Sequence, residues 1–409
     1  MLHDTPLRDR HEAFLRSLSD AQPVATGGRP GAATGGRLPA GAIQYVPYAL
    51  PGQSEPACEL VAMFDQIEPE YAAIRRGSAL LDCPQRGTVI VAGGDRREFL
   101  NRMLTQEFKD FTTGTARSSF WLNRKGRIDA DVLVLEPSAG EERTILSVDI
   151  HQAASTVQSL SEFQFSDDVA VRDASAEFHH LSLHGPEALR VIAAASGAKS
   201  FALEPGAAAT ILIDSVEVVV ARHDQTGEIG LELIAPFDRA GDVWEALLAC
   251  GDAGPFRCRP VGWFAYNIAR IEAGTPLMNI DFSSQNLPHE TGILRQRVSF
   301  TKGCYLGQEI VARMENLGKP KQQLVGLRMQ DDLLPGAGSQ VFAIQDDAMG
   351  EQIGVVTSST LSPMLSAAPI AFAMLKTSHA APGAAVLVNA EGEQARAEVA
   401  ALRFLQEAR

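Results

Sequence analysis

The sequence predicts an α+β protein that ends in an all-β domain. Helical and strand periodicities intermingle over most of the chain, whereas after about Lys319 only short strands bounded by turn residues follow one another. The 409 residues, 45% of them apolar, can fill the cores of two or three domains. The sequence Gly-Lys-Pro-Lys beginning at Gly318 breaks the preceding helical pattern. We therefore expect a boundary that divides the chain into residues 1–318 and residues 319–409.

Charge and cysteine content exclude several classes of function. The formal net charge of −14 disfavours duplex nucleic acid as a partner. No apolar run approaches the roughly 18 residues of a membrane span, and the N-terminal residues are too charged for a signal peptide. The five cysteines are scattered without a C-x-x-C pair, so neither a disulfide framework nor a structural zinc site is expected. These features predict a cytoplasmic protein that contacts no membrane and binds no metal.

The elements of the first half follow from hydrophobic spacing and turn chemistry. Pro69 suits the first turn of a helix, Asp95 can cap another, and Asn123 with Gly126 is typical of a hairpin turn. The Gly-rich residues 25–41 lack the ending of a phosphate-binding loop and predict a surface loop. The expected helices are 12–18, 68–81, one that follows Asp95, and 151–163, and the expected strands are 88–92, 118–122, 127–135 and 144–148.

The second half continues the mixed pattern and then changes to strands alone. Gly274 and Pro276 end the helix predicted from residue 261. Helices are expected at 186–195, 237–249 and 261–273, and strands at 181–184, 210–213, 216–221 and 230–234. A small barrel or sandwich is expected from strands at 324–329, 340–344, 353–358, 370–375, 385–388 and 395–404.

The segment from Val298 to Met314 has the densest chemical content. A strand is expected to run into a turn at Gly303, and Gly307 permits close backbone approach just before a helix. Cys304 would then lie near a helix start and beside Lys302, and both neighbours favour the thiolate. Buried cysteines are common, so the residues leave open whether this thiol is functional or structural.

Basic residues concentrate around the same segment. Between Gly292 and Gln330 seven Lys and Arg stand against two Glu, within a chain of net charge −14. This strip predicts a local anion site, with a solvated face as the alternative.

Two further groups of side chains are weaker candidates for chemistry. His180 and His184 would share a strand face and could bind metal, but spacing fixes no third ligand, so structural histidines are the preferred interpretation. Asp129 and Asp131 would also share a face and could form a general acid/base pair, with solvated carboxylates as the alternative.

A series of short motifs spans nearly the whole chain. They are Thr5-Pro6-Leu7, Leu81-Asp82, Asn123 with Gly126 and Asp131, Thr226-Gly227-Glu228 with Gly230-Leu231-Glu232-Leu233, Arg270-Ile271-Glu272-Ala273-Gly274 and Val356-Thr357-Ser358 with Ser362-Pro363. In this order they resemble the aminomethyltransferases, the T-proteins of glycine cleavage. The segment Lys302-Gly303-Cys304-Tyr305 with Gly307-Gln308-Glu309 resembles the signature of the YgfZ branch of folate-binding proteins in that superfamily.

The resemblance implies a fold and a ligand. It implies two ferredoxin-like lobes and a C-terminal β-barrel around a central channel for tetrahydrofolate. It places Glu232 at the position of a pterin-binding glutamate, and a carboxylate can accept two hydrogen bonds from the amide-amine edge of a pterin. Arg270, in a shared motif, is counted with the cofactor-binding residues, and Arg295, Arg297 or Lys302 would suit the anionic folate tail.

Departures from the family bear on the activity. The catalytic aspartate of the T-proteins aligns with Ala130, a folate-contacting arginine is replaced by Tyr266, and a barrel tyrosine is replaced by Met374. Only a shifted Asp129 or Asp131 could supply the missing acid or base. Whether the chain is an enzyme is therefore left open, with Cys304, Asp131 and Asp129 as the catalytic candidates.

Three functions remain as hypotheses. The first is a tetrahydrofolate-binding protein that supports iron-sulfur cluster assembly or repair through Cys304, with client or assembly proteins as partners. One thiolate cannot hold a cluster alone, so any cluster contact would be shared. The alternative is a tetrahydrofolate-dependent aminomethyl- or methyltransferase. The third is a folate sensor or scaffold.

Overall fold

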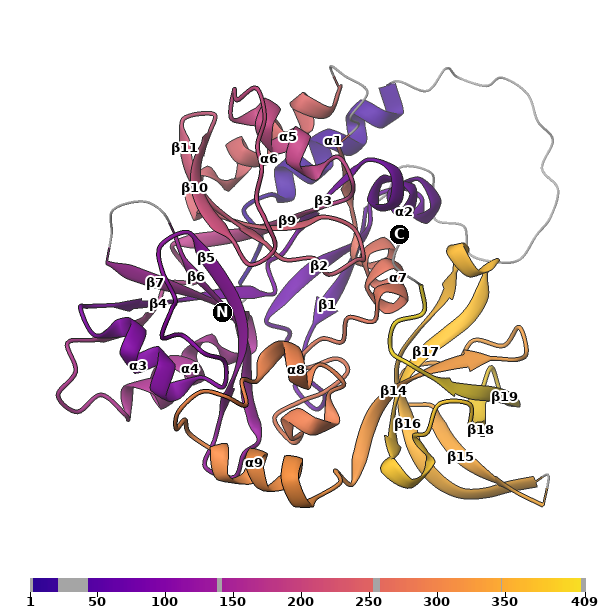
Figure 1. The fold of residues 1–409 in the computed structure, drawn as a ribbon. Helices are drawn as coiled ribbons and strands as arrows, with labels where there is room; N and C mark the ends of the chain where they lie inside the picture. Colours follow the sequence, from indigo (N-terminus) through magenta and orange to yellow (C-terminus); the bar gives the residue numbers. More distant parts are fainter. Residues whose placement is uncertain (1–2, 21–42, 138–141, 253–257, 347, 406–409) are drawn as a thin grey trace, which may run out of the picture.

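The computed structural model describes residues 3–20, 43–137, 142–252, 258–346 and 348–405. The Gly-rich loop predicted for residues 25–41 lies outside these residues. The described chain contains two sheets flanked by helices, which we call the first and second lobes, and a closed barrel at its C-terminal end (Figure 1). This arrangement confirms the predicted α+β class with a C-terminal β-barrel.

The first lobe is a five-stranded antiparallel sheet in the order β5-β6-β7-β4-β8, covered on one face by α3 and α4. Apolar residues alternate along the strands, and those on the covered face, such as Trp121 and Leu146, pack against the helices. The hairpin predicted around Asn123 is confirmed by the pairing of β5 with β6. The bounds are β4 (Arg86–Ala92), α3 (Arg96–Met103), β5 (Thr115–Leu122), β6 (Ile128–Glu136), β7 (Arg143–Asp149), α4 (Ile150–Ser161) and β8 (Ala170–Asp173).

The second lobe is a six-stranded sheet in the order β10-β11-β12-β9-β3-β13. Residues 78–82, predicted as the end of a helix, form strand β3, because α2 ends before Gly77 and all five residues of the strand are buried. A strand buried on both faces has a continuous apolar run, which periodicity alone does not separate from a helix. The bounds are β3 (Ser78–Asp82), β9 (Phe178–His184), α5 (Ala188–Ala195), β10 (Ala208–Ile213), β11 (Val216–Arg222), β12 (Gly230–Pro236), η1 (Phe237–Arg239), α6 (Ala240–Asp252) and β13 (Cys258–Val261).

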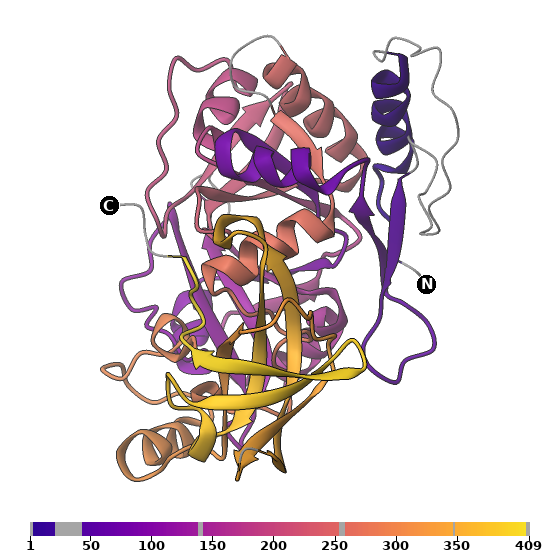
Figure 2. The ribbon, with the colours of Figure 1, turned by 90° about the vertical axis from the view of Figure 1, so that its right-hand side faces the viewer.

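Elements that precede and follow these sheets complete the second lobe. Figure 2 shows α1 and the β1–β2 hairpin together along one side of the molecule. Helices α2 and α7 pack against each other, and α7 also contacts the barrel strand β16. Gly274 adopts a left-handed conformation that ends α7, as predicted. The bounds are α1 (Arg8–Asp20), β1 (Gln44–Tyr48), β2 (Cys58–Met63), α2 (Ile67–Arg76) and α7 (Trp263–Ala273).

The barrel is closed in the order β14-β17-β16-β15-β18-β19. Small and branched side chains such as Val341, Ala371 and Val388 fill its interior. A buried ion pair joins it to the lobes, because Arg270 of α7 contacts Asp281 and also donates to Ser358 Oγ of β16 at 2.6 Å. The bounds are β14 (Gln322–Met329), β15 (Gln340–Gln345), β16 (Ala348–Ser362), η3 (Pro363–Leu365), β17 (Ala368–Lys376), η4 (Thr377–His379), β18 (Ala385–Ala390) and β19 (Glu393–Ala400).

A long connecting segment runs from α7 to the barrel. It contains η2 (Pro288–Glu290), α8 (Leu294–Arg297) and α9 (Gln308–Leu317). The strand predicted before Gly303 is absent from the described structure, and the buried Val298 and Tyr305 anchor an irregular loop instead. No helix among the described residues is long and apolar enough to cross a membrane.

Candidate functional site

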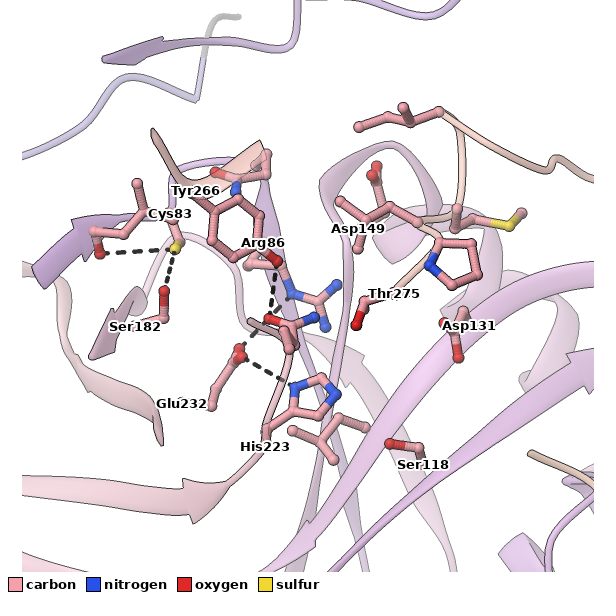
Figure 3. A pocket seen from close by; sticks show the side chains of 18 of the residues that line it. Cys83, Arg86, Ser118, Asp131, Asp149, Ser182, His223, Glu232, Tyr266 and Thr275 are labelled. Atoms are coloured by element: carbon pink, nitrogen blue, oxygen red, sulfur yellow. Dashed lines mark hydrogen bonds and ion pairs between the residues drawn. The ribbon is translucent and has the colours of Figure 1, made fainter. Parts of the chain in front are cut away.

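A cavity of about 70 Å³ lies where the two sheets face each other. Apolar residues of both sheets, among them Leu135 and Ile234, pack together beside it and fix the separation of the lobes. Its walls come from β4, β6, β9, β12 and α7 and from the loop that follows α7. In Figure 3, side chains of both lobes converge on this space. We refer to it as the central cavity.

Glu232 is a buried carboxylate in the wall of the central cavity. Its Oε1 accepts a hydrogen bond from Ser147 Oγ at 2.7 Å and lies 2.8 Å from His180 Nδ1 and 3.7 Å from Arg86 Nε. Burial alone would raise the pKa of Glu232, but the hydrogen bond from His180, the nearby His223 and the charge of Arg86 hold it well below its usual range. Glu232 is therefore an anion with one oxygen, Oε1, already fixed by internal donors.

The second oxygen of Glu232 faces His223. The Nδ1 atom of His223 lies 3.9 Å from Oε2, too far for a hydrogen bond, and it is buried without a partner among the described residues. Gln85 also lines the central cavity, and its Oε1 is likewise buried without a described partner. Unpaired buried polar atoms are costly. Their position on this wall indicates that the cavity is shaped for a polar ligand.

His180 and His184 both make internal side-chain contacts, which agrees with their interpretation as structural histidines. Burial lowers the pKa of both, that of His184 to about 4, so the rings are neutral at pH 7. His180 bridges Thr88 Oγ1, at 2.7 Å, and Glu232, while His184 lies 3.0 Å from Ser182 Oγ. Within the described residues no group of three or more His, Cys, Asp or Glu side chains is placed to hold a metal ion.

Asp131 lies on the first-lobe side of the central cavity. Its Oδ1 accepts from Arg297 Nε at 2.7 Å, and its Oδ2 lies 3.4 Å from the same guanidinium group. Both residues line the cavity. Ala130, the neighbouring residue, is fully buried in the core under α3 and α4, on the other face of the sheet. Strand β6 therefore presents an aspartate to the cavity at position 131.

Asp129 does not join Asp131, contrary to the expectation that the two share a strand face. A β-bulge shifts the pairing so that Trp121 faces Ala130 whereas Leu122 faces Ile128, which leaves Asp129 as the extra residue. Asp129 lines a different cavity beside Trp121, and its carboxylate accepts from Asn123 Nδ2 at 2.9 Å. Partial burial raises its pKa. The bulge separates the predicted acid/base pair.

Three basic residues predicted to bind the ligand lie outside the wall of the central cavity. Lys302 donates to the carbonyl oxygens of Asn101, Leu104 and Gln106 at 2.6, 2.8 and 2.6 Å, and burial lowers its pKa to about 8. Arg295 is exposed and pairs with a surface glutamate, and Arg270 is buried in the contact with the barrel. Arg297 is the member of the predicted basic strip that reaches the cavity.

Cys304 is exposed in the loop before α9, and it is not among the residues that line the central cavity. Cys58, Cys83 and Cys258 are buried, and Cys83 lies in the cavity wall with its sulfur 3.4 Å from Ser182 Oγ. Burial raises the pKa of Cys83, so its thiol stays protonated. The exposed thiol is therefore separate from the site formed by Glu232.

Several residues of the site were missed by sequence reasoning. Arg86, Ser147 and Tyr48 come from three different strands, and no local motif marks any of them. Asp149 lies just before a predicted helix, so its potential as a helix N-cap was the signal in the sequence that could have found it. Tyr266 was noted only as a departure from the family, yet its ring lines the cavity in Figure 3.

The sequence matches two family descriptions over most of its length. Residues 38–302 match the GCVT N-terminal domain, and residues 322–406 match the glycine cleavage T-protein C-terminal barrel domain. The aminomethyltransferase of Geobacillus kaustophilus is 30% identical over 354 residues, which cover 86% of this chain and 93% of that protein. A probable aminomethyltransferase of Halobacterium salinarum is 30% identical over 350 residues, with 84% and 92% covered.

The fold is also similar to a solved structure. The glycine cleavage system aminomethyltransferase T of Bartonella henselae superimposes with a TM-score of 0.77 at 24% sequence identity, covering 89% of this chain and 95% of that one. Its lobes and barrel are therefore arranged like those described here. By its sequence and by the order of its two domains, this chain belongs to the aminomethyltransferase family, the folate-dependent family of the glycine cleavage T-protein.

Proposed function

We propose that the central cavity binds tetrahydrofolate and that the chain transfers a one-carbon unit, as an aminomethyl or methyl group, to or from it. The observation that carries the proposal is the anionic Glu232, buried in the cavity wall with Oε1 fixed by internal donors and Oε2 3.9 Å from His223 Nδ1, without a hydrogen bond to it. A pterin presents adjacent N–H donors to such a carboxylate. The ordered Oε1 contacts orient Oε2 before the ligand arrives.

The walls suit the rest of the ligand. Leu81, Trp263, Tyr266 and Met278 supply apolar and aromatic surface for a flat ring system. Arg297 is positioned to attract the anionic tail once its bond to Asp131 is shared. Bound tetrahydrofolate would supply an amine nitrogen that exchanges the one-carbon unit.

The position of Asp131 favours transfer over binding alone. A carboxylate held by Arg297 in the cavity wall can orient a substrate amine and stabilise positive charge on it. The substitution at Ala130 removes nothing from the cavity, because that side chain packs into the opposite core. The curated relatives in Geobacillus and Halobacterium are named for aminomethyl transfer, which agrees with this choice.

A second candidate function rests on a different observation. Cys304 is exposed within the segment that resembles the YgfZ signature, so its thiol is accessible to a partner protein. This second candidate function is the support of iron-sulfur cluster assembly or repair. The remaining cysteines lie elsewhere in the fold, so a cluster at Cys304 would need ligands from a client or assembly protein.

Anaerobic calorimetric titration with tetrahydrofolate tests the folate site. Glu232→Gln is expected to weaken binding about 10- to 100-fold, because a hydrogen bond to a charged group contributes roughly 1.5–3 kcal/mol. Glu187→Gln, a change on the surface of the second lobe, is the matched control and should bind like the wild type. Equal affinity for wild type and Glu232→Gln would contradict the assignment of Glu232, and no binding to the wild type would overturn the proposal.

A further inference from the structure

Three carboxylates line the central cavity, and their partners differ. Asp131 is paired with Arg297, and Glu232 lies 3.7 Å from Arg86. No guanidinium or ammonium group among the described residues forms an ion pair with the third, Asp149. Two cations therefore pair with two of the three acids, and Asp149 is the acid whose hydrogen-bond donors are a backbone N–H and a hydroxyl.

Asp149 ends β7 and caps α4. Its Oδ1 accepts from the backbone N–H of His151 at 2.9 Å, and its Oδ2 accepts a hydrogen bond from the Tyr48 hydroxyl. Burial raises the pKa of Asp149, and these two hydrogen bonds offset only part of that effect. The geometry fixes both oxygens while leaving the carboxyl group in the cavity wall.

Tyr48 reaches this carboxyl group from the N-terminal hairpin. It lies at the end of β1, 101 residues away in sequence, and it also lines the central cavity. Burial raises the pKa of Tyr48, and the neighbouring Asp149 raises it further, so the phenol keeps its proton and remains a donor. The β1–β2 hairpin thus contributes a hydroxyl that orients an acid of the first lobe.

The charged and titratable groups around Asp149 come from four elements besides its own strand. They are Tyr48 on β1, Cys58 on β2, Arg86 on β4 and His151 on α4. The His151 ring packs 5.2 Å from that of Tyr48, and its Nε2 is buried without a described partner. Arg86 is close enough to favour the carboxylate of Asp149 but donates both of its close contacts to Ser147. The guanidinium nearest to Asp149 therefore gives its hydrogen bonds to Ser147 and not to Asp149.

We infer that Asp149 is the residue that exchanges a proton with the ligand in the central cavity, and that Tyr48 is its positioning residue. This inference rests on the proposed one-carbon transfer. It assigns the two other acids different tasks: Glu232 binds as an anion, and Asp131 stays paired with Arg297. Cavity acids with contrasting surroundings are a common basis for dividing binding from proton transfer.

Such a transfer releases one proton and consumes another, so a single group can both donate and accept a proton. When an amine nitrogen gains a one-carbon unit, an N–C bond forms and the N–H proton is released. The bond between that carbon and its donor atom breaks, and the donor atom takes the electron pair and a proton. When it carries a proton, Asp149 gives that proton to the departing donor atom and then accepts the proton released by the nitrogen. The carboxyl group ends in the state in which it began.

The test follows the carboxyl group itself by infrared difference spectroscopy over a pH series. Wild type should show a protonated carboxyl band that titrates above the usual range of an aspartate and is lost in Asp149→Asn, while bands from other carboxyl groups with raised pKa, such as Asp129, remain in that variant. Asparagine is a good helix cap, so this variant should fold. Asp131→Asn should retain the band. Tyr48→Phe should raise its midpoint further, because the phenol favours the carboxylate, whereas a merely structural tyrosine would leave the midpoint unchanged.

Adding tetrahydrofolate separates this inference from the proposed function. Calorimetry on the same samples reports whether the ligand binds. Binding together with a shift of the Asp149 midpoint supports the inference, and binding without a shift overturns it while the folate site stands. No binding overturns the proposed function and the role of Asp149 with it. A wild-type spectrum without the band would also overturn the inference.

Discussion

Single residues of the site owe their properties to partners that are distant in sequence. Glu232 remains ionised although it is buried, because Ser147, His180 and Arg86 gather around it from three strands. Family resemblance pointed to Glu232, but no spacing rule could assemble its partners. Lys302 shows the reverse case, since a basic residue predicted to bind an anion instead satisfies three backbone carbonyls. Charge counted along the chain does not reveal which cations are already used.

For a single residue, the Cys304→Ala variant distinguishes a functional thiol from a structural one. Cys304 is exposed, so the substitution should change the free energy of unfolding by less than about 1 kcal/mol. The buried Cys58→Ala is the matched control and should cost more. Chemical denaturation measures both. If the iron-sulfur candidate is correct, Cys304→Ala should also lower the activity of iron-sulfur enzymes in cells that depend on this chain, and unchanged activity would count against that candidate.

At the scale of elements, the sequence predicted most helices and strands but not the irregularities that aim the side chains. Strand β6 and its hairpin were expected, and the pairing confirms them. The bulge that turns Asp129 away from the cavity could not be predicted, because both aspartates fit a regular alternating pattern. Strand β3 was missed for a related reason, since burial on both faces removes the alternation that identifies a strand.

The loop before α9 gives a test of local geometry. Gly307 has a φ of +80°, and a Cβ there would lie 2.8 Å from the carbonyl oxygen of Asn123 in the β5–β6 turn. Gly307→Ala should therefore destabilise the fold by about 1–2 kcal/mol or more. Gly303 has open space around it and no left-handed φ, so Gly303→Ala should be nearly neutral. Equal unfolding free energies for the two variants in urea would contradict this description of the loop.

At the scale of the whole molecule, one buried pair joins the lobes to the barrel. Arg270 of α7 and Asp281 have fully buried side chains, and both bond to Ser358 of β16. Because Arg270 lies in a motif that resembles the family, it was expected among the cofactor-binding residues. The structure gives it hydrogen bonds to Asn267, Thr275, Asp281 and Ser358, and of these only Thr275 lines the central cavity. A C-terminal β domain could be predicted from the change to a pattern of strands alone, whereas this contact depends on tertiary packing.

Arg270→Met should leave Asp281 as an uncompensated buried charge. Breaking such a pair typically costs about 3–5 kcal/mol, and we expect a loss of that size in the free energy of unfolding. Arg190→Met, which removes a surface partner of Glu187, should cost less than about 1 kcal/mol. Urea denaturation followed by fluorescence compares the two. A loss below 1 kcal/mol for Arg270→Met would show that the pair does not hold the barrel to the lobes.

The proposed folate site depends most on Glu232 as the anchor of the ligand between the lobes. An anaerobic crystal structure of the protein with tetrahydrofolate tests this claim most directly. We expect electron density for a pterin whose N–H groups bond to Glu232, with His223 as a neighbour and the ring against Tyr266. Density for the ligand at another surface, or a cavity that stays filled by solvent at saturating tetrahydrofolate, would contradict it.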